Sequence, residues 1–287
     1  MRFREIVNKE KKVEPAWVFR AKGMVWRLVS ADAGMFVGED RNPDAKAVSF
    51  FGLNRVSGEI LWEGISFDEA WWIAIEATHR DRVFLHGFSR PDMPDHRRIL
   101  ALDLFTGRVA WSRDDVRYIF AVDDSVFTSK DTATGRTLFE LHLRTGSTLR
   151  SWENDASELS AARSRAQVQI QEGPEFPVPL EEIPATDQRL DPVQKLCQNE
   201  NATGPIEVLR KGNACLFSYH EKGKTPGTLR NILNIVSISS GERLFAETLD
   251  ESVQSVVPDS FFVQDEILYF VKDRGQLTAV NISDLVR

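Results

Sequence analysis

Residues 101–111 read ALDLFTGRVAW, and variants of this phrase recur along the chain. They read GLNRVSGEILW at 52–62, ELHLRTG at 140–146, IVSISSGERLF at 235–245 and, more weakly, AVNISDL at 279–285. Apolar and polar residues alternate in the phrase, as they do along a strand with one buried face. The glycine that follows Ser or Thr supplies the positive φ of a hairpin bend at no steric cost. We therefore predict a strand, a tight turn and a second strand in each full copy.

The spacing of the copies predicts the architecture. The turn glycines stand at 58, 107, 146 and 241, with Leu285 in the equivalent place at the end, so the gaps are 49, 39, 95 and 44 residues. A period of about 40–50 residues with four short strands per repeat is typical of β-propeller blades. The gap of 95 residues is about two periods and indicates either an insertion or a degenerate blade.

Aromatic residues follow the turns at a regular distance. Trp62, Trp111 and Phe245 each stand four residues after a turn glycine. A large aromatic side chain on an outer strand can pack against the neighbouring blade, where it buries much apolar surface. We therefore expect these residues to hold successive blades together.

The full phrase resembles the repeat of the quinoprotein-type (PQQ-like) β-propellers. The residues that match the pattern A-x-D-x-x-T-G-x-x-x-W are Ala101, Asp103, Thr106, Gly107 and Trp111. In the other copies Gly52, Ser57 and Phe245 depart from it. The resemblance implies an all-β propeller of four-stranded blades. It implies no cofactor site, because the repeat residues join blades rather than form a site.

The resemblance does not extend to the catalytic members of that family. Those quinone-dependent dehydrogenases are longer and exported, and they carry an adjacent cysteine pair near the cofactor. Here Cys197 and Cys215 stand 18 residues apart. We therefore expect a bacterial propeller without a cofactor or a metal site.

The two ends of the chain are expected to meet in one blade. The segment around Trp17 (AWVFRAKGMVWRLV, 16–29) resembles the segment around Trp62 (LWEGISFDEAWWIAI, 61–75). It can therefore supply the outer strand that the terminal copy AVNIS lacks, which removes two free sheet edges. The sequence predicts a ring of five clear repeats, or six if residues 153–204 form a degenerate blade.

Composition predicts a single soluble domain over residues 1–287. The chain has 42% hydrophobic residues, enough for a large core, and its two cysteines suggest no disulfide framework. It has no apolar run of about 20 residues, and residues 1–15 lack the apolar core of a signal peptide. A net charge of −7 argues against nucleic-acid binding, which needs a basic surface. The expectation is a cytoplasmic monomer.

Residues 153–204 differ from the rest of the chain. They hold ten acidic and four basic residues and five of the twelve prolines, and they lack the repeat phrase. Asp191-Pro192 stands directly before VQKLCQNE and indicates a short helix with proline at its first position. The stretch is predicted to be an acidic insertion of mixed structure, with a degenerate blade as the alternative.

Candidate contact residues lie in loops that propellers place on one face. The loops between blades carry the acids Asp68, Glu69, Asp114, Asp115 and Asp250. The loop 89–98 between the second and third strands of its blade carries Arg90, His96, Arg97 and Arg98. Trp71 is a candidate for a position facing the channel. By contrast, His86 alternates with Phe84 and Phe88, so we predict a pleated-sheet position rather than a ligand.

Two functions remain open at this stage. Loops on a rigid scaffold commonly carry function, and no catalytic spacing stands out. The first hypothesis is therefore a non-catalytic interaction or scaffold propeller that binds an unidentified protein on its loop face. The alternative is an enzyme of hydrolase or lyase type, with a site over the channel at Asp68, Arg98, Asp115 and Asp250.

Overall fold

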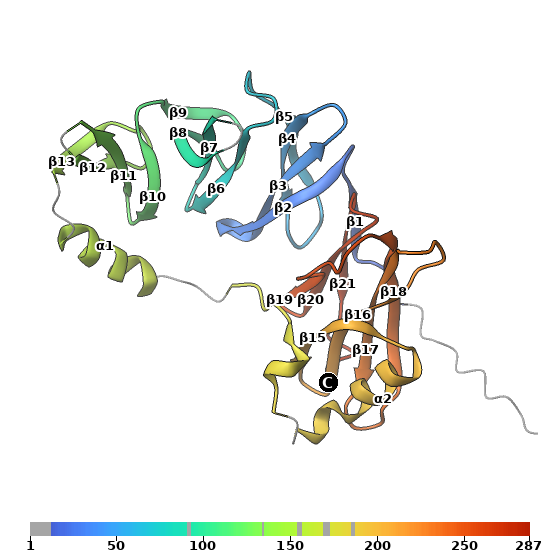
Figure 1. Cartoon of the computed structure of the whole chain (residues 1–287). Coiled ribbons are helices and arrows are strands. Elements are labelled where there is room, and N and C mark those ends of the chain that lie inside the picture. The colour runs from blue at the N-terminus through green and yellow to red at the C-terminus, as the bar shows by residue number, and fades with distance from the viewer. Residues whose placement is uncertain (1–12, 91–92, 134, 154–156, 169–172, 185–186) are drawn as a thin grey trace, which may run out of the picture. The chain divides into compact units, whose positions relative to one another are not determined.

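A computed structural model describes residues 13–90, 93–133, 135–153, 157–168, 173–184 and 187–287. Contacts between Cα atoms divide the chain into two compact units, each with its own buried apolar clusters. Unit 1 comprises residues 1–20 and 174–287, and unit 2 comprises residues 21–173 (Figure 1).

Unit 2 contains three antiparallel sheets whose strands lie side by side in chain order. The first holds β2 (Met24–Ala31), β3 (Met35–Asn42), β4 (Ala47–Asn54) and β5 (Ile60–Ile65). The second holds β6 (Ile73–His79), β7 (Arg82–Arg90), β8 (Met93–Asp103) and β9 (Val109–Arg113). The third holds β10 (Arg117–Val122), β11 (Ser125–Thr132), β12 (Gly135–His142) and β13 (Thr148–Glu153). A 3-10 helix at Asp32–Gly34 joins β2 to β3.

Unit 1 contains two sheets. The fourth sheet holds β15 (Thr203–Lys211), β16 (Ala214–Lys222), β17 (Leu229–Ser237) and β18 (Arg243–Val253), with the two-residue β14 (Val178–Pro179) at its edge. The fifth holds β19 (Phe261–Gln264), β20 (Ile267–Lys272), β21 (Gln276–Asn281) and β1 (Trp17–Arg20). The predicted all-β fold with five blade-like sheets is confirmed.

The terminal strands share the fifth sheet, as predicted. β1 pairs antiparallel with β21, and Trp17 lies opposite Ala279. The side chains of Trp17 and Phe19 are buried on this strand, whereas that of Val18 between them is 41% exposed. The N-terminal strand therefore supplies both a hydrogen-bonded edge and core side chains to the C-terminal sheet.

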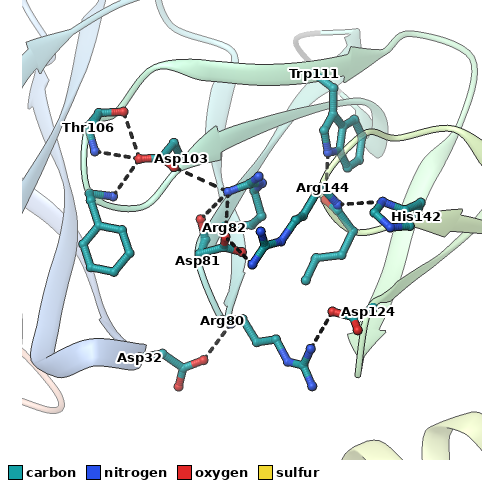
Figure 2. Close-up of polar contacts among 12 residues, drawn as sticks. Asp32, Arg80, Asp81, Arg82, Asp103, Thr106, Trp111, Asp124, His142 and Arg144 are labelled. Atoms are coloured by element: carbon teal, nitrogen blue, oxygen red, sulfur yellow. Dashed lines mark hydrogen bonds and ion pairs between the residues drawn. The ribbon is translucent and has the colours of Figure 1, made fainter.

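Asp103 organises the turn of the strongest repeat (Figure 2). Its Oδ1 accepts hydrogen bonds from the backbone N–H of Phe105 (3.1 Å) and from the N–H (3.0 Å) and hydroxyl (2.9 Å) of Thr106. Gly107 then adopts φ 66°, and its N–H donates to the Asp103 carbonyl at 2.9 Å. The sequence prediction for this turn is confirmed.

Trp62 joins the first sheet to the second. Its Nε1 donates to the carbonyl of Leu104 at 2.8 Å, and its ring lies over Gly107. Trp111 repeats this bond to the third sheet, donating to the carbonyl of Leu143 at 2.9 Å. The predicted packing of these aromatics against the neighbouring sheet is therefore confirmed within unit 2.

Residues 153–204 contribute helices that cover sheets in both units. On α1 (Ser157–Val168), Ala162 packs in a cluster with Phe127 of the third sheet. On α2 (Asp191–Asn199), which carries Pro192 in its first turn as predicted, Val193 and Cys197 pack with Phe217 of the fourth sheet. Short 3-10 helices lie at Leu180–Glu182 and Gln188–Leu190. We interpret the stretch as an insertion, and the single domain over 1–287 stays a prediction.

We expect Gly107→Ala to lower the free energy of unfolding by about 2–4 kcal/mol. The left-handed backbone costs a non-glycine residue about 1–2 kcal/mol, and an added Cβ, 2.8 Å from the Trp62 ring, costs more through overpacking. Urea unfolding measures the loss. Gly34→Ala is the matched control, because Gly34 has φ 67° and no atom within 4 Å of the added Cβ. Equal losses in the two variants would contradict the role of the indole contact.

The pairing of β1 with β21 leads to a second prediction. Phe19→Ala should cost about 3–5 kcal/mol of unfolding free energy, because it leaves a cavity in the core of the fifth sheet. Val18→Ala, one residue earlier on the exposed side, should change it by less than about 1 kcal/mol. If both variants unfold at the urea concentration of the unaltered protein, β1 is not an integral strand.

Candidate functional site

The loop before β6 holds three predicted site residues. Glu69 uses Oε1 to accept hydrogen bonds from the backbone N–H of Trp71 (3.0 Å) and Trp72 (2.8 Å). The Arg41 guanidinium stacks 5.0 Å from the centre of the Trp71 ring and donates to the Trp71 carbonyl at 2.9 Å. Asp68 is exposed. Glu69 and Trp71 therefore shape the entry to β6, and Asp68 faces solvent.

The loop after β9 lies beside β8. Arg98 Nε is 2.9 Å from Asp114 Oδ1, and Arg97 next to it is exposed. Asp115 accepts a two-pronged contact from Arg113, at 2.8 and 3.0 Å. Those hydrogen bonds hold the pKa of Asp115 below its usual value.

The remaining predicted residues fall elsewhere. Asp250 belongs to β18 of unit 1, where burial raises its pKa. The side chain of Arg90 lies outside the described residues. Of the predicted residues, the structure brings Arg98 and Asp114 into contact, and Asp250 belongs to the other unit.

His96 belongs to a cluster with two residues that were not predicted as site residues. His96 Nδ1 hydrogen-bonds to Glu76 Oε2 at 2.9 Å, and His86 Nδ1 lies 2.6 Å from the same oxygen. The two imidazole rings stack with their centres 3.6 Å apart and an interplanar angle of 8°. Phe88 packs edge-on against both rings. Three adjacent strands, β6, β7 and β8, therefore present their side chains to one point.

Two β-bulges flank this cluster. Between Ile75 and Ala77 the register of β6 against β7 shifts, so Glu76 is the extra residue. Between Arg97 and Ile99 the register of β8 shifts in the same way, and Arg98 has φ 62°. A bulge redirects a side chain out of the regular alternation, and a non-glycine residue at positive φ is uncommon. The cluster therefore depends on two local departures from regular sheet.

The electrostatics of the cluster favour an ionised Glu76. Burial raises the pKa of Glu76, but the contacts and charges of His86 and His96 outweigh it and hold that pKa below its usual value. Burial, and next the charge of Glu76, raise the pKa of Tyr118 on β10. A carboxylate between two imidazoles can transfer protons or ligate a metal ion.

A buried ion pair positions the strand that carries Glu76. Glu39 on β3 accepts the N–H of Ile75 at 2.7 Å and a hydrogen bond from Arg41 Nε at 2.8 Å. Arg41 Nη2 in turn donates to the carbonyl of Ile73 at 2.6 Å. Both charged side chains are buried. This clamp fixes β6 against the first sheet next to the bulge.

At the end away from Glu76, charged side chains join the hairpin turns of the three sheets (Figure 2). Asp32 accepts the N–H of Arg80 at 2.6 Å, and the Arg80 guanidinium reaches Asp124 at 2.5 Å. Asp81 in the same turn is 3.3 Å from Arg82 and 3.5 Å from Arg144. These contacts run from the first sheet to the third and are structural links between sheets.

Large apolar side chains are exposed at this same end. They are Val56, Ile60, Leu61, Phe105, Val109 and Leu149, here called the apolar stripe. Val56 and Phe105 occupy the same place in successive hairpin turns, and each is at least half exposed. The bond from Trp62 to Leu104 holds the second of these turns against the first sheet. The stripe is therefore carried by neighbouring hairpins.

The sequence alone did not reveal the Glu76–His86–His96 cluster. The prediction that His86 is a pleated-sheet residue is correct, since it lies on β7. His86 and His96 stand on the two strands of one hairpin, which is a signal that sequence reasoning could have used. Glu76 gave no such signal, because its direction depends on a bulge.

Comparison with known proteins gives limited similarity. Residues 29–111 match a family described as a domain of unknown function (DUF4905), which is well under half of the chain. No curated protein sequence matches this chain significantly. No helix in the described ranges has the length and hydropathy needed to cross a membrane.

Solved structures with partial similarity are propellers and quinoprotein-type enzymes. BamB from Moraxella catarrhalis is 11% identical, with a TM-score of 0.34 over 93% of this chain and 86% of BamB. A europium-containing methanol dehydrogenase is 12% identical, with a TM-score of 0.31 over 92% of this chain and 52% of the enzyme. The Dos1 propeller is 8% identical, with a TM-score of 0.32 over 90% of this chain and 67% of Dos1. Such values carry no inference about what this chain binds.

The buried clamp predicts a large mutational effect. Arg41→Met should lower the free energy of unfolding by about 3–5 kcal/mol, because it leaves the buried Glu39 carboxylate without its counter-charge. Arg80→Met removes an exposed ion pair and should cost less than about 1 kcal/mol. Chemical denaturation measures both. The double variant Glu39→Gln/Arg41→Met should lose less than Arg41→Met alone, and a larger loss would contradict the pairing.

Proposed function

We propose that this protein is a non-catalytic interaction module that binds a protein partner through the apolar stripe. The observation that carries the proposal is the repeated exposure of large apolar side chains on neighbouring hairpins. Single exposed apolar residues are normal, but here they recur on hairpins of three successive sheets, and grouped apolar surface is typical of a protein-binding face. Phe105, near the middle of the stripe in chain order, is the residue type that often anchors such interfaces.

The repeat itself does not require these exposed residues. Within each turn the structural work is done by the polar residue at the start, the glycine and the aromatic four residues later, as Asp103, Gly107 and Trp111 demonstrate. Positions 105 and 109 lie between them and are free to be polar. Apolar residues there therefore expose apolar surface to water without stabilising the sheets, and a partner would cover them.

The predicted loop-face contacts remain a second location for the partner. Arg97, Asp114 and Asp68 are exposed there, and charged groups of this kind tune association rate more than affinity. The enzymatic alternative has less support. Of its predicted groups, Asp115 is held by Arg113 and Asp250 belongs to unit 1.

A paired-variant experiment tests the proposal. Proteins captured from the native host by the unaltered chain are compared with those captured by Phe105→Ser/Val109→Ser and by Arg97→Ser/Asp114→Ser. The stripe variant should lower the affinity for a captured partner at least tenfold, because removal of a central apolar anchor typically costs more than about 1 kcal/mol. The loop-face variant should retain the partner.

Stability serves as the control in this experiment. Both variants alter exposed residues, so their unfolding free energies should stay within about 0.5 kcal/mol of the unaltered protein. Loss of the partner in the loop-face variant alone would move the interface to the loop face. Retention in both variants would reject the stripe.

A further inference from the structure

The Glu76–His86–His96 cluster has the composition and convergence of a metal-binding site. Two imidazole nitrogens lie 2.6 and 2.9 Å from one carboxylate oxygen. In a tetrahedral site with bonds of about 2.0–2.1 Å, neighbouring donor atoms are about 3.3 Å apart. Each imidazole nitrogen therefore needs to move less than about 1 Å away from the carboxylate oxygen to admit an ion between them.

The burial of His86 is a second feature of the cluster. His86 is 3% exposed, and neither of its ring nitrogens makes a well-aligned hydrogen bond within the described part of the chain. A buried polar group left in this state costs about 1–3 kcal/mol. The Glu76 carboxylate, 2.6 Å from His86 Nδ1, offsets part of this cost, but His86 Nε2 makes no hydrogen bond within the described part of the chain.

The first and second sheets differ in the residues at the position of His86. Met35 and Arg82 begin equivalent strands, since they pair with Asn54 and Asp103, the polar residues of the two turns. Counting from these residues, His86 takes the place of Glu39, and Phe88 takes the place of Arg41. In the first sheet that position is closed by a buried ion pair, whereas in the second sheet the side chain two residues on is apolar. The apolar ring of Phe88 offers no hydrogen-bond partner to the imidazole of His86.

We infer that Glu76, His86 and His96 bind a divalent first-row transition-metal ion of the zinc type. Two imidazoles and one carboxylate are a donor set that suits Zn²⁺ and its neighbours, whereas Mg²⁺ and Ca²⁺ prefer oxygen ligands throughout. The ion would bond the imidazole nitrogens that now face Glu76. Three protein ligands leave at least one coordination position for water or for a group of a partner.

The surrounding structure holds the donors in place. The Glu39–Arg41 clamp bonds the backbone at Ile75, directly before Glu76. Phe88 packs edge-on against both imidazoles. The two stacked rings must turn out of parallel for both nitrogens to bond one ion, because each nitrogen lone pair lies in its ring plane. His96 has 40% of its side chain exposed, which leaves a side open for an ion to enter.

The metal site does not rest on the proposed partner binding. Along β8, His96 stands seven residues before Asp103, a distance of about 23 Å in an extended strand, and the stripe begins beyond Asp103. The two sites therefore lie toward opposite ends of the second sheet, and either can fail without the other.

Direct metal titration of the full chain tests the inference. The metal-free protein is titrated with Zn²⁺ by calorimetry and with Co²⁺ by its visible d–d absorption, and bound zinc is counted after dialysis. We expect one high-affinity ion per chain. His96→Ala should weaken binding at least about 100-fold, because it removes a direct ligand, and Glu76→Gln should weaken it at least about tenfold.

Controls separate ligation from folding and from adventitious binding. His142→Asn removes another histidine of unit 2, one that lies in a turn rather than in the cluster, and should bind zinc like the unaltered protein. His96 is partly exposed, so its variant should keep the circular dichroism spectrum of the native fold. His86→Ala is a less useful variant, because truncation of a buried side chain can unfold the sheet.

Two results would overturn the inference. One is an unaltered protein that binds neither Zn²⁺ nor Co²⁺ as a single equivalent. The other is a folded His96→Ala or Glu76→Gln variant that binds zinc as tightly as His142→Asn does. In either case the cluster would be a buried carboxylate–imidazole contact within the sheet.

Discussion

The hydrogen bond from a tryptophan indole to a turn carbonyl of the next sheet sets the geometry of unit 2. Trp62 and Trp111 bridge 42 and 32 residues of sequence in this way, to Leu104 and Leu143. A Cβ on the turn glycine would come within 2.8 Å of the indole ring at Gly107 and 2.6 Å at Gly146, so this packing requires glycine. Because each sheet is fixed to the next through its turn, the hairpins that carry the apolar stripe are held side by side.

Buried charge is used differently in neighbouring sheets. In the first sheet Glu39 and Arg41 satisfy one another and bond the backbone of β6. In the second sheet the equivalent position holds His86, whose neighbours are Glu76 and His96. The Glu39–Arg41 pair holds β6 in place, whereas the three side chains of the cluster converge in a way that suits a bound ion. The first arrangement supports the second, since it fixes the strand on which Glu76 stands.

The two candidate surfaces differ in their physical chemistry. The apolar stripe offers area for hydrophobic association at one end of the sheets, where polar links such as Arg80–Asp124 join the turns beside it. The loop face offers exposed charges, many already paired within the chain, as Arg98 is with Asp114. Pairing within the chain lowers the gain available from a partner's charge, whereas exposed apolar surface gains when any complementary surface covers it.

Sequence by itself determined the repeated unit of this protein. Asp103, Thr106, Gly107 and Trp111 act through local turn chemistry and a fixed four-residue spacing, so the strands, the turns, the aromatic contacts and the terminal pairing could be predicted. Tertiary structure alone decided the Glu76–His86–His96 cluster. Its donors come from three strands, and two β-bulges, at Glu76 and Arg98, turn the side chains together. A bulge shifts the alternation of a strand by one residue, and that shift is fixed by pairing with neighbouring strands rather than by any residue pattern along the chain.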